Sequence, residues 1–309
     1  MTTHFPALAS NGAGHREPYR YAHLIRRPGD AVTSQRFEFE RLSQTVRSFL
    51  SYQVGQSTRD EAARALWVQG RPGEGKSVGC IIACLNAGFA VAVVSPGLFA
   101  GETEGKAVEV LHDLLAELMR WSIENELPVV VIIDDFDLST ANIGENTGHT
   151  VNSQLLVNEF MALADHRHRY RTPYGNIAFI FTVNDATGMR ESLHRSGRAI
   201  WYDHVPTAED KANIAWATLA PKTSTERALV DALVRRHRKQ PVAFWKALQL
   251  RMQALHAHQL LQGGMPDKAA IDRAYGQNFP LTPDIAWQAA KELRQHRVRS
   301  WITQRFGRR

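Results

Sequence analysis

The sequence predicts an α/β fold in which helices cover both faces of a parallel sheet, followed by an all-helical C-terminal domain. Strand-like and helical segments alternate as far as about residue 205. Residues 129–133 are a continuous β-branched run, which is typical of a strand buried on both faces of a parallel sheet. After Pro206 the strand-like runs end, and helical periodicity continues through the rest of the chain.

These patterns divide the 309 residues into three parts. Residues 1–34 contain Gly, Pro and polar residues without steady periodicity, so we expect a loosely ordered N-terminal arm. Residues 35–205 form the expected α/β core. Residues 206–309 form the expected helical domain with a basic tail.

Each element of the core is predicted by its own pattern. The apolar spacing of residues 37–52, which starts with Phe37 and Phe39, indicates an amphipathic helix. Further helices are expected at 76–87, 108–124 and 151–165, and strands at 66–68, 89–94, 129–133, 176–183 and 199–202.

Composition excludes several classes of protein. The chain is 44% apolar and 22% charged, which fits a globular protein rather than a disordered or collagen-like one. Its two cysteines, Cys80 and Cys84, exclude a disulfide framework and a four-cysteine zinc site, and we expect both to be small buried side chains.

No membrane partner is expected. The N-terminus lacks the continuous apolar core of a signal peptide, which predicts a cytoplasmic location. The apolar stretch 78–100 approaches the length of a membrane span, but Asn86-Ala87-Gly88 interrupts it. A buried helix followed by a buried strand explains this stretch better.

The basic excess lies at the C-terminus. Residues 291–309 hold seven Lys and Arg side chains against one Glu, so this segment carries the whole formal charge of +6. Such a tail can contact phosphates, as in nucleic acid, or an acidic partner, and it can equally be a solvated helix end.

Residues 70–77 read Gly-Arg-Pro-Gly-Glu-Gly-Lys-Ser and match GxxxxGK[ST] at every fixed position. Glycines let successive N–H groups point at phosphate oxygens, and the following helix presents its positive end to the same anion. We expect Lys76 to reach the outer phosphates and Ser77 to bind Mg²⁺. The expected ATP-binding residues are Gly70, Arg71, Pro72, Gly73, Glu74, Gly75, Lys76, Ser77 and Val78. The fold prediction thereby becomes a P-loop αβα sandwich.

Polar side chains follow two of the predicted buried strands. Asp134 and Asp135 follow the 129–133 run, at the strand end that faces the ligand crevice of an open α/β sheet. We expect Asp134 to hold Mg²⁺ through water and Asp135 to polarise an attacking water. Asn184 follows the next strand, where it could orient water or form an Asx turn.

Arg195 and Arg198 are candidates for arginine fingers. If the chain leaves the sheet at this edge, they reach a neighbouring subunit's γ-phosphate more easily than their own P-loop. The alternative is a pair of solvated surface arginines. His166 and His168 alternate with arginines, which disfavour a nearby metal cation, so we expect a solvated loop there.

The order of these motifs resembles the AAA+ ATPase superfamily and, within it, the Rubisco activase group. Besides the P-loop, the resemblance rests on Ile133-Asp134-Asp135-Phe136-Asp137, on Thr150-Val151-Asn152-Ser153-Gln154-Leu155, on Thr182-Val183-Asn184-Asp185 and on residues 241–248. It covers roughly residues 35–255. One departure is Asp135, which is one methylene shorter than the usual catalytic Glu.

The resemblance implies an AAA+ core with a helical lid and ATP bound between them. It also implies self-assembly into a ring, usually a hexamer, that remodels a protein client through pore loops. In this chain those loops would be residues 98–105, where Leu98 and Phe99 would grip peptide, and residues 139–150.

Three functions follow as hypotheses. The first is a Mg²⁺-dependent ATPase, forming ADP and phosphate, that remodels a protein. The second is a nucleic-acid-associated ATPase of the helicase-loader or transposition-accessory type, which the basic tail and residues 235–239 favour. The third is a nucleotide-gated scaffold that scarcely hydrolyses ATP, which the short Asp135 side chain allows.

Overall fold

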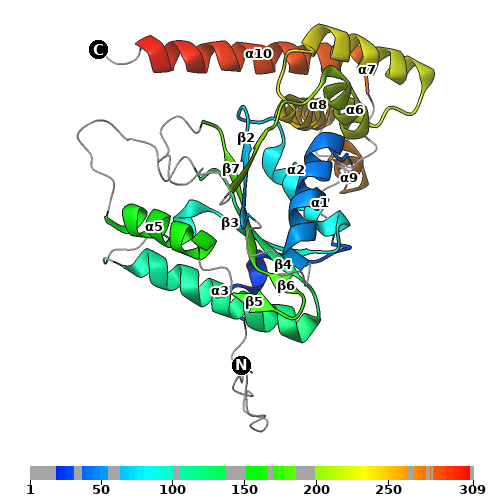
Figure 1. Cartoon of the computed structure of the whole chain (residues 1–309). Coiled ribbons are helices and arrows are strands. Elements are labelled where there is room, and N and C mark those ends of the chain that lie inside the picture. Colours follow the sequence, from blue (N-terminus) through cyan, green and yellow to red (C-terminus); the bar gives the residue numbers. More distant parts are fainter. Residues whose placement is uncertain are drawn as a thin grey trace, which may run out of the picture.

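The computed structural model describes residues 19–30, 37–54, 63–99, 103, 105–136, 151–165, 170–185, 199–262, 268–275, 279 and 281–306. In these residues a twisted sheet lies between two layers of helices, and a further group of helices sits beyond one end of the sheet (Figure 1).

The main sheet has six strands in the order β1-β3-β4-β7-β2-β8. They are β1 (Ile25–Arg26), β2 (Ala65–Gln69), β3 (Ala90–Val94), β4 (Val129–Ile133), β7 (Ala178–Val183) and β8 (Ala199–Asp203). All neighbours pair in parallel except β1, which is antiparallel to β3. A separate short hairpin consists of β5 (Arg171–Thr172) and β6 (Gly175–Asn176). The predicted α/β class with a parallel sheet is confirmed.

Alternate residues of each strand enter two separate hydrophobic clusters, one on each face of the sheet. Leu66, Val68 and Ile180 pack with α1 (Glu40–Val54) and α2 (Lys76–Asn86). On the opposite face, residues such as Trp67 and Phe181 pack with α3 (Lys106–Asn125) and α5 (Val151–Asp165). Since both faces are covered, the strands carry the continuous apolar runs seen in the sequence.

The C-terminal part is helical, as predicted. It comprises α6 (Ala208–Leu219), α7 (Ser224–His237), α8 (Ala243–Gln262), α9 (Lys268–Tyr275) and α10 (Pro283–Phe306). Capping boxes start α6, at Thr207 and Asp210, and α7, at Thr223 and Glu226. Apolar side chains of these helices join the cluster over α1 and α2, so this lid packs directly on the core. None of the described helices is both long enough and apolar enough for a membrane crossing.

The loosely ordered arm predicted for residues 1–34 is wrong for the described segment 19–30. The side chain of Tyr21 is 3% exposed, and β1 extends the sheet beside β3. The Glu117 carboxylate of α3 accepts the backbone N–H groups of Arg20 at 3.1 Å and Tyr21 at 2.6 Å. A two-residue strand is too short for a periodic pattern, and its acceptor lies 96 residues away, so the sequence carried no local signal.

Two local predictions also need correction. Helix α1 begins at Glu40, and Phe37 and Phe39 precede it instead of forming its first turn. Phe99 ends a short 3₁₀ segment (Pro96–Phe99) and is buried with its ring against Phe160, while Leu98 packs on the same cluster. Phe99 is therefore core rather than a peptide-gripping side chain.

Residues 139–150 lie outside the described residues. Cys80 and Cys84 are both buried, as predicted.

We predict that Glu117→Gln lowers the free energy of unfolding by about 1–3 kcal/mol, because the amide cannot accept both N–H groups of the docked segment. Urea unfolding of the full chain measures the change. Glu109→Gln, in the same helix but with an exposed side chain, is the control and should change stability by less than about 0.5 kcal/mol. Equal stability of the two variants would contradict the role of Glu117.

Candidate functional site

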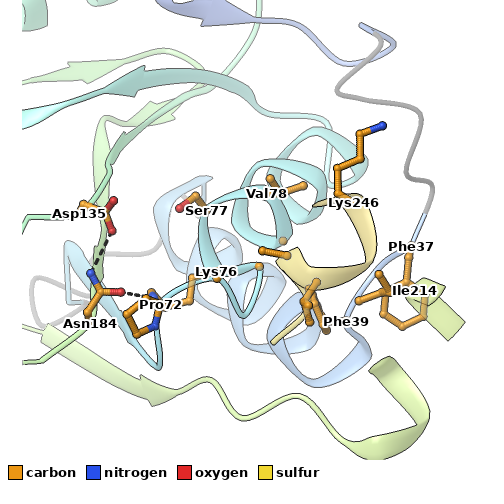
Figure 2. Close-up of a pocket in the computed structure, with 15 residues that line it drawn as sticks. Phe37, Phe39, Pro72, Lys76, Ser77, Val78, Asp135, Asn184, Ile214 and Lys246 are labelled. Carbon is orange, nitrogen blue, oxygen red and sulfur yellow. Dashed lines mark hydrogen bonds between the residues drawn. The ribbon is translucent and has the colours of Figure 1, made fainter. Parts of the chain in front are cut away.

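A cavity of about 430 Å³ opens where β2, β4 and β7 end, between the core and the lid (Figure 2). Its lining residues are Phe37, Phe39, Pro72, Gly73, Gly75, Lys76, Ser77, Val78, Gly79, Asp135, Asn184, Ile214, Val242, Ala243 and Lys246. Its size falls in the range of small-molecule and cofactor sites. Lys76, Asp135 and Asn184 lie together at one end, and Phe37, Phe39 and Ile214 lie at the other.

The loop between β2 and α2 forms the floor of the cavity. Gly73 and Gly75 adopt φ values of 73° and 86°, which L side chains rarely adopt. A Cβ atom on Gly75 would lie 3.0 Å from the Phe39 ring, so the position also lacks room for a side chain. Helix α2 begins at Lys76 and presents its N-terminus to the cavity, an arrangement that attracts anions.

The Lys76 ammonium is held by three oxygen atoms. It donates to the Asn184 Oδ1 atom and the Gly70 carbonyl, both at 2.8 Å, and to the Arg71 carbonyl at 3.2 Å. Only 5% of Lys76 is exposed, so this charge depends on its partners. The contacts fix the ammonium between the P-loop and the end of β7.

Asp134 and Ser77 form a second polar pair behind the loop. The Ser77 hydroxyl donates to the Asp134 carboxylate, which also accepts the Thr182 hydroxyl at 2.6 Å. A hydroxyl beside a carboxylate is a donor set that suits Mg²⁺, which binds through one or two protein oxygens plus waters and phosphates. In the described part of the chain, no group of three or more His, Cys, Asp or Glu side chains offers another metal site.

Asp135 sits in a conformation that is unusual for a residue with a side chain. Its φ is 51°, and two bonds to Thr182 hold the turn: Asp135 N–H to the hydroxyl oxygen at 3.0 Å and Phe136 N–H to the carbonyl at 2.9 Å. The Asp135 carboxylate accepts the Asn184 side-chain amide at 3.3 Å. Backbone of this kind persists only where its surroundings enforce it, and it concentrates at functional sites.

The other end of the cavity is apolar and aromatic. The Phe37 and Phe39 rings meet edge to face, with centroids 5.3 Å apart. Ile214 of α6 and Val242, just before α8, complete this end from the lid. A flat, largely apolar group is the kind of ligand that such walls accept.

His204 ties the P-loop to the segment that leads into the lid. Its Nε2 donates to the Glu74 carbonyl at 3.0 Å, and its ring meets Phe39 edge to face at 4.7 Å. Burial lowers the pKa of His204, with a smaller contribution from the nearby Lys76 charge. The imidazole is therefore neutral at pH 7, and it adds no charge beside the P-loop.

The structure brings together most of the predicted site residues. One connected set of hydrogen bonds joins Lys76, Ser77, Asp134, Asp135 and Asn184 with Thr182, whose hydroxyl accepts from the Asp135 N–H group and donates to Asp134. Of the predicted P-loop residues, Pro72, Gly73, Gly75, Lys76, Ser77 and Val78 line the cavity, whereas Gly70, Arg71 and Glu74 do not. Arg195 and Arg198 lie outside the described residues.

Several site residues escaped sequence reasoning. Thr182 reads as one more residue of a buried strand, and only its contacts reveal that it bridges Asp134 and Asp135. Ile214 and Val242 read as ordinary helix positions. The available signals for Thr182 were its position two residues before Asn184 and its place in the 182–185 segment that carries the family resemblance.

Comparison with known proteins agrees with this geometry. Residues 66–202 match the family model AAA, "ATPase family associated with various cellular activities". Curated relatives include the ribulose bisphosphate carboxylase/oxygenase activase of Nostoc sp., 27% identical over 197 residues, covering 60% of this chain and 47% of that protein. The chloroplastic activase of Chlamydomonas reinhardtii is 26% identical over 194 residues, with 60% and 47% covered.

The chain thus spans about half the length of the curated relatives that it matches. The matched region contains the P-loop, the Asp134-Asp135 pair and Asn184, and it ends in β8. Residues 66–202 of this chain are thus similar to the AAA family of ATPases, and about 60% of the chain is similar to the Rubisco activases.

Proposed function

We propose that the chain binds ATP with Mg²⁺ in this cavity and hydrolyses it to ADP and phosphate. One observation carries the proposal: side chains from three separate strand ends, Lys76, Asp134 and Asn184 among them, converge on the N-terminus of α2. A buried ammonium, a hydroxyl–carboxylate pair suited to Mg²⁺ and a second carboxylate that lines the cavity are the parts that phosphoryl transfer to water requires.

In this reaction, separate groups of the site bind the phosphates, hold the metal and orient the water. Backbone N–H groups of the P-loop and the N-terminus of α2 bind the phosphates. Lys76 exchanges its bond to Asn184 for a phosphate oxygen. Ser77 and Asp134 would hold Mg²⁺, which neutralises charge on the phosphates when bound. Asp135 and Asn184, already joined at 3.3 Å, orient the attacking water.

The apolar end of the cavity receives the purine base. Phe37 and Phe39 come from the segment before α1, and Ile214 and Val242 come from the lid, so the base would lie between core and lid. We therefore propose that nucleotide binding draws on both parts of the chain.

The larger-scale function follows from the relatives. Ring assembly and remodelling of a protein client are supported by the similarity to the activases. A cytoplasmic location and a trans role for Arg195 and Arg198 are further parts of the proposal. We propose that the client is a protein, but we name no particular protein, since the match covers only about half of the relatives' length. If the wild-type chain binds ATP but does not hydrolyse it, the tests below would favour the nucleotide-gated scaffold instead.

A basic surface on the lid supports a second candidate, a nucleic-acid-associated ATPase. Arg235 and Arg236 end α7, and the Arg236 guanidinium lies 5.9 Å from the ring of Trp287 on α10. Burial lowers the pKa of His237, and the nearby charges of Arg294 and Arg236 lower it further. The positive charge of this helix junction therefore comes from the arginines and not from His237. DNA-stimulated ATPase activity that disappears without residues 291–309 would favour this candidate.

We predict that Lys76→Ala weakens Mg²⁺–ATP binding at least about 30-fold, because a charged contact to the phosphates is lost. Isothermal titration calorimetry of the full chain measures the affinity. Lys239→Ala, an exposed lid lysine, is the control and should bind like the wild type. Unchanged binding by the Lys76 variant would remove the P-loop from the mechanism.

We predict that Arg198→Ala binds ATP normally but loses about 10³-fold or more in kcat, the range typical of an arginine finger. Asp135→Asn should also bind ATP without turnover. If the finger acts in trans, mixing the two inactive variants restores activity, because each subunit supplies what its neighbour lacks. Normal hydrolysis by Arg198→Ala, or a mixture that stays inactive, would contradict the trans assignment.

We predict that Thr182→Val lowers kcat about 10- to 100-fold and raises the Mg²⁺ concentration needed for half-maximal activity. The substitution removes the hydroxyl that donates to Asp134 and accepts from the Asp135 amide. Thr182→Ser keeps the hydroxyl and should retain most of the activity. A valine variant with wild-type Mg²⁺ dependence would show that the hydroxyl does not position the metal-binding carboxylate.

A further inference from the structure

Glu74 occupies an unusual place for a buried carboxylate. It lies within the P-loop between Gly73 and Gly75, which line the cavity, yet Glu74 does not line it. The Glu74 side chain is 8% exposed and contacts the lid. An ionised group at this depth is costly unless partners compensate it, so its partners reveal what it does.

Those partners both belong to the lid. The Lys211 ammonium of α6 lies 2.8 Å from Glu74 Oε1, and the Lys211 side chain is 15% exposed. The Val242 N–H donates to Glu74 Oε2 at 3.3 Å. Lys211 also donates to the Gln240 carbonyl at 3.3 Å, so one ion pair joins the P-loop, α6 and the turn before α8.

Backbone contacts strengthen the same junction. The Ala243 N–H donates to the Gly73 carbonyl at 2.8 Å, and His204 donates to the Glu74 carbonyl at 3.0 Å. Residues 73 and 74 therefore bind four separate groups, which belong to the segment before α6, to α6 itself, to the turn before α8 and to the first residue of α8.

The lid residues that face the cavity adjoin these anchor points. Ile214 follows Lys211 by three residues in α6, which places the two on the same side of the helix. Val242 itself bonds to Glu74, and Ala243 bonds to Gly73. The position of the apolar wall is thus fixed to the P-loop rather than only to the rest of the lid.

We propose that the Glu74–Lys211 ion pair is a positioning device that holds the lid wall against the base of the nucleotide bound by the P-loop. This inference rests on the proposed function. Because the pair acts on the wall formed by Ile214, Val242 and Ala243, its loss affects the base and leaves the phosphate cradle in place. Glu74 and Lys211 are positioning residues, and neither needs to touch the ligand.

The test compares two ligands, Mg²⁺–ATP and Mg²⁺–tripolyphosphate, which carries the three phosphates without a base. Glu74→Gln and Lys211→Met, each checked by circular dichroism, should weaken ATP binding about 5- to 150-fold, the range of typical coupling energies. Tripolyphosphate affinity should stay within about twofold of wild type. Lys239→Met, at an exposed lysine of the lid, should change neither.

The double variant Glu74→Gln/Lys211→Met completes a double-mutant cycle. An ATP affinity close to that of either single variant supports the pair as one unit, because the second substitution then has no partner left to remove. Additive losses overturn the pairing. Equal weakening of both ligands overturns the proposal in favour of a role in shaping the cradle, and unchanged ATP affinity overturns it outright. A wild-type protein that binds neither ligand overturns the proposed function itself, and this inference with it.

Discussion

The parallel register of β2, β4 and β7 brings the polar side chains of the site to one edge of the sheet. Ile180 of β7 pairs with Leu66 of β2 and with Ile132 of β4, so the three strands run level with one another. Their carboxyl ends therefore meet at one edge, and the loops that follow carry Lys76, Asp134 and Asn184 into contact. The helices on both faces keep water from the strands, which makes this register the low-energy arrangement.

That arrangement places several groups that destabilise the fold, two buried charges and one left-handed residue, close together. Lys76 and Glu74 are nearly buried, and Asp135 has a left-handed backbone. Each of these would destabilise the fold if it stood alone, by roughly 1–3 kcal/mol for the backbone conformation. Hydrogen bonds to Asn184, Lys211 and Thr182 offset the cost. The site is consequently stable only as a connected set, and this is why single substitutions in it are expected to act on several partners at once.

The parts of this site that short sequence motifs encode could be predicted from the sequence. The P-loop, the acidic pair and Asn184 each follow an apolar run, and a local pattern is enough to find them. Contacts between distant segments left no such pattern. Glu117 and Tyr21 are 96 residues apart, and Glu74 and Val242 are 168 apart. The helical prediction for Phe37 fails because an apolar residue just before a helix extends the same pattern as one within it.

The two cysteines sit in α2, directly behind the P-loop, and both are fully buried. Burial raises the pKa of each thiol, so almost no thiolate forms at neutral pH, and alkylating and oxidising reagents act on the thiolate. The folded chain should accordingly tolerate air and maleimide dyes. A cysteine introduced at an exposed site would then carry a fluorophore selectively, without prior removal of the native ones.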